Sequence, residues 1–175
     1  MLIDLSDFLS HEDKRLNLSA ELEMDSFQAG RVSYPIADKT PVRLDITGIG
    51  GKKIKISAAF DVTLMMPCDR CLEEVRQTIH IDTSKEVNLS ETGEDRKEAE
   101  DEVEELDGTS FDVERFAYGE ILLDLPMKVL CREACKGLCS KCGKNLNRGS
   151  CDCDTASLDP RMAKALEVFN SFKEV

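Results

Sequence analysis

Four close pairs of cysteines are the residues of this chain whose type and spacing could do chemistry. Two thiolates that are two residues apart can point at one ion, and zinc binds four sulfurs at about 2.3 Å in a tetrahedron. Eight sulfurs are the number that two such sites use. We therefore predict zinc, bound by Cys68 and Cys71, Cys131 and Cys135, Cys139 and Cys142, and Cys151 and Cys153.

The last two pairs are close enough in sequence to form one site. The short interval from Cys142 to Cys151 costs little loop-closure entropy, and it contains turn-forming asparagines and glycines. The sequence thus predicts a zinc knuckle of the zinc-ribbon type, formed by Cys139, Cys142, Cys151 and Cys153. By exclusion, the other four cysteines form the second site. An exchange of Cys135 and Cys139 between the two sites stays open.

Thiol redox chemistry is the alternative for Cys68 and Cys71, since a CxxC pair can form a reversible disulfide. Redox activation usually places such a pair at a helix N-terminus, whereas this pair follows a long alternating segment that is typical of a strand. Of the two histidines, His80 falls on the polar side of a predicted strand, which indicates a surface position. No Ser/His/Asp group or nucleotide motif is present, so we predict that the protein is not an enzyme.

The net charge of −12 is distributed unevenly. Residues 91–114 hold twelve acidic residues against two basic ones, a balance of −10. This composition predicts a solvated acidic linker or helix, which could also mimic nucleic-acid charge or hold a basic protein. Residues 131–150 carry +4, and we expect these charges either to offset zinc-bound thiolates or to contact RNA, through Arg132, Lys136, Lys141, Lys144 and Arg148.

Apolar residues at every second position predict antiparallel strands in the N-terminal half. The longest such run extends from Ile54 to Met66, and glycines at 48, 50 and 51 predict a hairpin turn before it. Residues 116–125 have helical spacing and end before Pro126. Asp159 and Pro160 begin a predicted amphipathic helix that extends to Phe172. The fold class is therefore α+β, with an antiparallel strand-rich body for which a barrel-like arrangement is one alternative.

This pattern predicts three parts: a body over residues 1–90, an acidic linker over 91–114, and a helix, zinc knuckle and C-terminal helix over 115–175 that pack with the body. The first residues lack a secretory signal, and no apolar run reaches the roughly 18 residues of a membrane helix. We expect a cytoplasmic protein, in which thiols stay reduced and cysteine clusters bind metal.

Two segments together resemble the YceD family of large ribosomal RNA subunit accumulation proteins. They are PCDRCLEEV at residues 67–75 and CREACKGLCSKCGKNLNRGSCDC at residues 131–153, with ILLDLPMKVLC before and DPRMAKAL after the second. The resemblance implies a role in the synthesis or accumulation of large-subunit ribosomal RNA. It also implies that Cys68, Arg70 and Cys71 are the family signature, and that the later cysteines place this chain in a cysteine-rich branch.

Three hypotheses for the function follow. In the first, the protein is a non-catalytic factor in ribosome biogenesis whose partner is ribosomal RNA or a basic large-subunit ribosomal protein. In the second, it is a thiol-redox or zinc-responsive regulator that uses the Cys68 and Cys71 pair. In the third, it is a structural adaptor whose zinc sites only fold the chain. The oligomeric state does not follow from the sequence.

Overall fold

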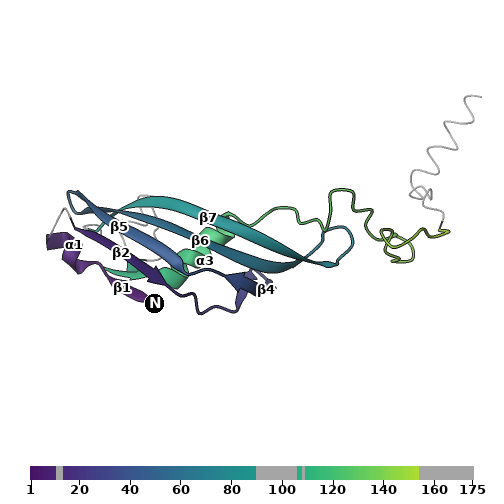
Figure 1. Cartoon of the computed structure of the whole chain (residues 1–175), viewed down its shortest axis with the longest axis horizontal. Coiled ribbons are helices and arrows are strands. Elements are labelled where there is room, and N and C mark those ends of the chain that lie inside the picture. The colour runs from purple at the N-terminus through teal and green to yellow at the C-terminus, as the bar shows by residue number, and fades with distance from the viewer. Residues whose placement is uncertain (11–13, 90–105, 108, 154–175) are drawn as a thin grey trace, which may run out of the picture. The chain divides into compact units, whose positions relative to one another are not determined.

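The computed structural model describes residues 1–10, 14–89, 106–107 and 109–153 (Figure 1). The chain divides into two compact units. Residues 1–67 and 74–129 form the first, here called the strand unit. Residues 68–73 and 130–175 form the second, here called the cysteine unit. The segment Cys68–Glu73 thus belongs to a different unit from the strands on either side of it.

The strand unit contains one large and one small antiparallel sheet. The large sheet consists of β2 (Arg15–Ala20), β3 (Ser26–Ala29), β4 (Val32–Lys39), β5 (Val42–Gly50), β6 (Lys53–Pro67) and β7 (Glu74–Asn88). The small sheet has the order β1-β9-β8, formed by Leu2–Asp4, Ser110–Asp112 and Leu106–Asp107. Its helices are α1 (Ser6–Ser10) and α3 (Val113–Leu123).

Strand β6 is the centre of the large sheet. Its first half pairs with β5, its second half pairs with β4 on the same side, and β7 pairs with its whole length on the other side. Alternate residues of β6, from Ile54 to Met66, are buried, as the apolar spacing predicts. The antiparallel, strand-rich body is thereby confirmed.

The predicted hairpin lies between β5 and β6. Its turn contains three consecutive residues with positive φ, which are Gly50 at 85°, Gly51 at 63° and Lys52 at 62°. The barrel-like alternative is wrong for the described part of the chain, because β2 and β7 each pair with a single strand and the sheet stays open. A closed barrel would require β2 and β7 to pair with each other.

Helix α3 begins at Val113, three residues before the predicted start. The Asp112 side chain caps it by accepting hydrogen bonds from the backbone N–H groups of Glu114 at 3.0 Å and Arg115 at 3.4 Å. Phe116 and Ile121 of α3 are buried in the core of the strand unit. Burying such side chains contributes about 1.5 to 3 kcal/mol each, which makes α3 part of the core rather than a surface addition.

One ion pair lies within this packing. Lys85 of β7 places its Nζ 2.5 Å from Oε1 of Glu120 on α3, and the same Nζ lies 5.4 Å from the ring centroid of Phe116. The Glu120 side chain is only 6% exposed. A carboxylate at that depth is costly without its partner.

We expect Lys85→Met to lower the free energy of unfolding of the strand unit by about 2 to 3 kcal/mol, because it leaves the Glu120 carboxylate buried and unpaired. The double variant Lys85→Met with Glu120→Leu should recover most of this loss, since it removes both charges. Urea unfolding followed by circular dichroism measures both. A double variant no more stable than Lys85→Met would contradict the assignment.

Two sequence predictions fall wholly or partly outside the described residues. The amphipathic helix at 159–172 lies outside them, and so does most of the acidic segment, of which only the last part is described, within β8, β9 and the start of α3. In the described chain, none of the helices has the length and apolarity to cross a membrane.

Candidate metal centres in the cysteine unit

The first four-sulfur cluster joins two segments that are about sixty residues apart in sequence. Cys68 Sγ lies 3.8 Å from Cys135 Sγ, and Cys71 Sγ lies 3.5 Å from Cys131 Sγ. All four sulfurs lie within 4.8 Å of one another. A tetrahedron with zinc–sulfur bonds of about 2.3 Å has sulfur–sulfur edges of about 3.8 Å, whereas a disulfide measures about 2.05 Å. The spacing therefore fits one metal ion and excludes disulfides here.

The second cluster consists of Cys139, Cys142, Cys151 and Cys153, whose sulfurs also lie within 4.8 Å of one another. Cys139 is buried and Cys142 is exposed, so this cluster is closer to solvent than the first. The structure thus brings the eight cysteines together in the two groups that spacing predicts, and Cys135 and Cys139 do not exchange. Each group could hold a metal ion.

The two CxxC segments fold into the same turn. The Cys68 carbonyl accepts a hydrogen bond from the Leu72 N–H at 2.9 Å, and the Cys139 carbonyl accepts one from the Gly143 N–H at 2.9 Å. The residue after each second cysteine has a left-handed backbone, with φ of 59° at Leu72 and 71° at Gly143. This turn lets both thiols of each pair point at one centre. Gly143 adopts it freely, whereas Leu72 does so under strain.

Burial of the Leu72 side chain does little to offset that strain, because the residue is 65% exposed. We expect Leu72→Gly to raise the unfolding free energy of the cysteine unit by up to about 1 kcal/mol, since a left-handed backbone costs a non-glycine residue about 1 to 2 kcal/mol and glycine gives part of that back as unfolded-state entropy. Denaturant-induced release of metal measures this. Equal stability in Leu72→Gly and the parent chain would show that the turn is not strained.

Arg70, the residue between the cysteines of the first pair, holds the two halves of the first cluster together. Its Nη1 donates to the Cys135 carbonyl at 2.8 Å, and its own carbonyl accepts a hydrogen bond from the Leu138 N–H at 3.0 Å. Gly137 lies against this carbonyl so closely that a Cβ there would be 2.9 Å from the oxygen. These contacts dock the CDRC turn on the CKGLC segment.

Asn147 supports the first cluster from the loop of the second. Its Nδ2 donates to Cys135 Sγ at 3.2 Å, while its Oδ1 accepts from the Lys136 N–H at 2.8 Å. A short antiparallel ribbon holds this loop, because Cys139 N–H donates to the Lys144 carbonyl and Leu146 N–H donates to the Gly137 carbonyl, both at 2.9 Å. Sequence reasoning treated Asn147 only as a turn former and missed Gly137. The segments GLC at 137–139 and NLN at 145–147 contain these two residues. Their roles follow only from the pairing of the two segments, which the sequence does not reveal.

Each cluster contains at least one thiol whose pKa is lowered. Burial opposes ionisation of Cys68, but N–H groups of Arg70, Cys131 and Cys71 outweigh it and lower its pKa to about 6. The pKa of Cys139 also falls to about 6, chiefly because the N–H groups of Cys142 and Lys141 donate to its sulfur. Donors already directed at sulfur are typical of sites that hold thiolates.

Other thiols of the two clusters ionise less readily. The N–H of Glu73 favours the Cys71 thiolate, yet burial and the three neighbouring thiols raise the pKa of Cys71 to about 12. Hydrogen bonding with the Cys142 thiol raises the pKa of Cys153 to about 12, and burial adds to this effect. A cation would displace these protons, so metal binding at either cluster must release protons and weaken as the pH falls.

The five basic residues considered for RNA contact divide into two sets. Arg148 donates to Glu73 Oε1 through Nε at 3.0 Å and Nη2 at 2.6 Å, and Lys144 Nζ donates to the Ser150 carbonyl at 2.5 Å. These two charges serve the folding of the unit. The second set is exposed, and its side chains form no ion pair and no hydrogen bond with any described residue. It consists of Arg132, Lys136 and Lys141. Lys136 also borders a hollow of about 500 Å³ beside Cys151 and Cys153.

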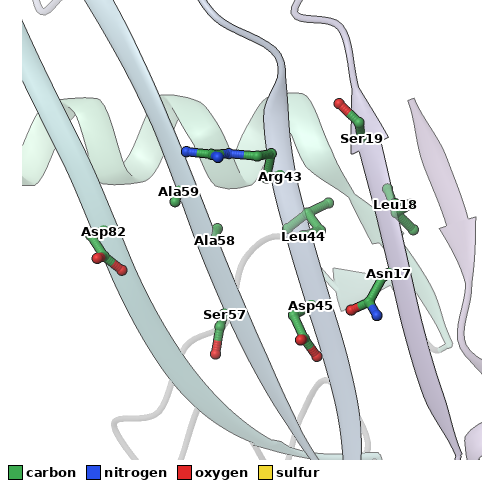
Figure 2. A pocket seen from close by; sticks show the side chains of 10 residues that line it. All are labelled: Asn17, Leu18, Ser19, Arg43, Leu44, Asp45, Ser57, Ala58, Ala59 and Asp82. Atoms are coloured by element: carbon green, nitrogen blue, oxygen red, sulfur yellow. The ribbon is translucent and has the colours of Figure 1, made fainter.

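A separate hollow of about 560 Å³ lies on the strand unit, and its lining has no group of side chains comparable to the cysteine clusters. Its floor is made of short side chains of β6, including Ser57 and Ala59, and Figure 2 shows Arg43 extending across it toward Ala59. Arg43 and Asp82 border it with opposite charges, and it contains no thiol or histidine. His80 lies elsewhere on β7, 78% exposed and 2.7 Å from Asp61, which agrees with its predicted surface position.

Comparisons with known proteins agree with the resemblance of the two cysteine segments. A relative from Arabidopsis thaliana, called "Large ribosomal RNA subunit accumulation protein YCED homolog 1, chloroplastic", is 26% identical over 153 residues, which cover 72% of this chain and 47% of the relative. Uncharacterized proteins of Mycobacterium bovis and Mycobacterium tuberculosis are each 31% identical over 101 residues, covering 58% of this chain and 48% of the relative.

The chain therefore spans about half the length of the curated relatives it matches. No solved structure matches it. The family model described as "Large ribosomal RNA subunit accumulation protein YceD" matches residues 56–169, a range that includes all eight cysteines. The chain belongs to the YceD family.

Proposed function

We propose that this protein is a non-catalytic cytoplasmic factor in the synthesis or accumulation of large-subunit ribosomal RNA, and that zinc bound at both cysteine clusters folds its cysteine unit. The observation that carries the proposal is the pair of four-sulfur clusters, each with its sulfurs within 4.8 Å of one another, in a chain of a family named for accumulation of this RNA. Four sulfur ligands leave no open position on the metal, which favours a structural role over a catalytic one.

The charges of the cysteine unit support contact with RNA. Arg132, Lys136 and Lys141 are exposed and unpaired among the described residues, so they are available to phosphate groups. A zinc ion bound by four thiolates carries a charge of −2, which Lys144 and Arg148 lie close enough in sequence to offset. The acidic segment 91–114 suits a basic ribosomal protein as a second partner.

A complementation experiment tests this function. In cells whose own copy is deleted, we expect the parent chain to restore the level of large-subunit ribosomal RNA, and Arg132→Glu combined with Lys136→Glu and Lys141→Glu to fail while still binding zinc. Arg43→Glu, which reverses an exposed charge on the strand unit, is the matched control and should complement.

Normal RNA levels with the triple variant would exclude RNA contact through these residues and leave the structural adaptor. The partners are tested separately by purification at low salt. Recovery of the protein without ribosomal RNA precursors or ribosomal proteins would count against the whole proposal.

A redox or zinc-responsive regulator is the second candidate, favoured by the low pKa of Cys68 beside Cys135 Sγ at 3.8 Å. Oxidation of two thiols to a disulfide by a peroxide would remove two ligands and release the metal. Mild hydrogen peroxide should then release zinc from the first cluster, and a thiol reductant should restore binding. Zinc that stays bound under this treatment excludes the regulator.

A further inference from the structure

The outer margin of β7 is a long strand edge. β7 pairs with β6 from Glu74 to Asn88 without any register shift, and it lies at one margin of the large sheet (Figure 1). Within the described residues, no strand pairs with its other side. A free edge of this length is a template for pairing with another strand.

The register shows which backbone groups point away from β6. Leu89 N–H donates to the carbonyl of Lys52, and these residues are opposite each other in the continued β6–β7 register. Such hydrogen-bonded pairs alternate with non-bonded pairs along an antiparallel ladder. The odd-numbered residues of β7 therefore bond to β6, and the even-numbered ones, from 76 to 86, direct their N–H and C=O groups outward. Among described residues, these outward groups accept one hydrogen bond, which Gln77 Nε2 donates to the Thr78 carbonyl at 3.4 Å.

Proteins usually protect such an edge with a proline, a bulge, a short strand or charged side chains. β7 has no proline, no glycine and no bulge over its 15 residues. It does carry charges on the exposed, even-numbered face, namely Glu74, Arg76, Asp82 and Glu86, together with His80. Arg76 and Glu86 form no ion pair with another described residue. The order of the charged residues along β7 decides whether this edge repels or attracts a second strand.

We propose that β7 pairs antiparallel with β7 of a second copy of this chain, with Ile81 on the two-fold axis. This register places Arg76 opposite Glu86, His80 opposite Asp82, and Thr78 opposite Ser84, each of them twice. No like charges are opposed. On the other face, Val75 is opposite Val87. Opposite charges across strands are favourable and like charges are unfavourable, so this edge is complementary to itself.

Neighbouring registers lack this complementarity. With His80 on the axis, Glu74 faces Glu86, and with Asp82 on the axis, that residue faces its own copy. With Ile79 on the axis, only one pair of opposite charges forms, between Arg76 and Asp82. The pairing buries little area compared with a standard interface of about 1,600 Å², so we expect a dimer that dissociates on dilution. This inference goes beyond the proposed function and does not depend on metal or RNA.

Sedimentation velocity of the full, zinc-loaded chain in the presence of reductant tests the pairing, because reductant removes disulfide-linked dimers. The 19.5 kDa chain should sediment increasingly as a dimer as its concentration rises. Arg76→Glu alone and Glu86→Arg alone should each weaken dimerisation about tenfold or more, since each places like charges opposite each other twice. The double variant should restore it. Arg31→Glu, an exposed position in the β3–β4 turn, should leave it unchanged.

Ser84→Pro is a second, independent variant. The Ser84 N–H points outward, so proline removes no backbone hydrogen bond to β6 and loses only the 3.3 Å hydroxyl contact with Ser57. It blocks the edge, and we expect a folded monomer. A parent chain that stays monomeric at all concentrations would overturn the proposal. So would a dimer that persists in Arg76→Glu, Glu86→Arg and Ser84→Pro, because its interface would then lie elsewhere.

Discussion

The 175-residue chain, purified without chelator, should contain two zinc ions by elemental analysis. Cys71→Ser should retain one ion, bound at the second cluster, and Cys142→Ser should retain one, bound at the first. Each loss follows because a tetrahedral thiolate site that loses one of four ligands binds zinc far more weakly. The control is Cys71→Ser combined with Cys142→Ser, which should bind none.

Removing the metal should unfold the cysteine unit and leave the strand unit folded. Among the described residues of the cysteine unit, the buried side chains are Cys68, Cys71, Cys135 and Cys139, so the unit has no apolar core apart from its ligands. Metal binding to such sites supplies about 10 to 16 kcal/mol of folding free energy in zinc-finger peptides. The strand unit has its own core, with buried residues from Ile3 to Val129.

Hydrogen exchange before and after chelation measures this difference. Protection should disappear at residues 130–153 and persist at β6 and β7. Acidification should have the same effect as chelation, because protons compete with the metal for the sulfurs of Cys71 and Cys153, whose pKa values are raised to about 12. An intact cysteine unit without zinc, or a chain whose eight thiols are oxidised and metal-free, would overturn the metal assignment.

Gly137→Ala should be the most damaging change outside the ligands themselves. Gly137 has φ of 77°, and a Cβ there would lie 2.9 Å from the Arg70 carbonyl oxygen and 3.3 Å from Arg70 Cβ. Moving that carbonyl would break its hydrogen bond with the Leu138 N–H. We expect a loss of roughly 2 to 3 kcal/mol, with zinc at the first cluster bound at least tenfold more weakly.

Two other glycines of the same unit are matched controls. Gly143 has a positive φ of 71° but nothing within 4 Å of a Cβ, so Gly143→Ala should cost only the strain of a left-handed backbone, about 1 kcal/mol. Gly149 has neither constraint, and Gly149→Ala should be neutral. Competition with a zinc chelator ranks the three variants. If Gly137→Ala binds zinc as well as Gly149→Ala, the close approach to Arg70 is unimportant.

The sequence predicted those features that depend on local spacing. Alternation of apolar residues predicted β6 and the antiparallel strands of the N-terminal half, because successive side chains of a strand point to opposite faces. The glycines predicted the β5–β6 turn, because positive φ values are accessible to them. Short intervals grouped the last four cysteines, and exclusion then grouped the first four.

The remaining features required the tertiary structure, because they join residues that are distant in sequence. The Arg148 bonds to Glu73 span 75 residues and the Arg70 bond to Cys135 spans 65, and no local pattern specifies either partner. The barrel-like alternative failed for the same reason, since strand periodicity defines the faces of a sheet but not which strands meet at its margins. The sequence by itself thus determined the grouping of the eight cysteines and the strands. Only the folded chain decided which charges hold the cysteine unit together, and that β7 lies at an edge of the sheet among the described residues.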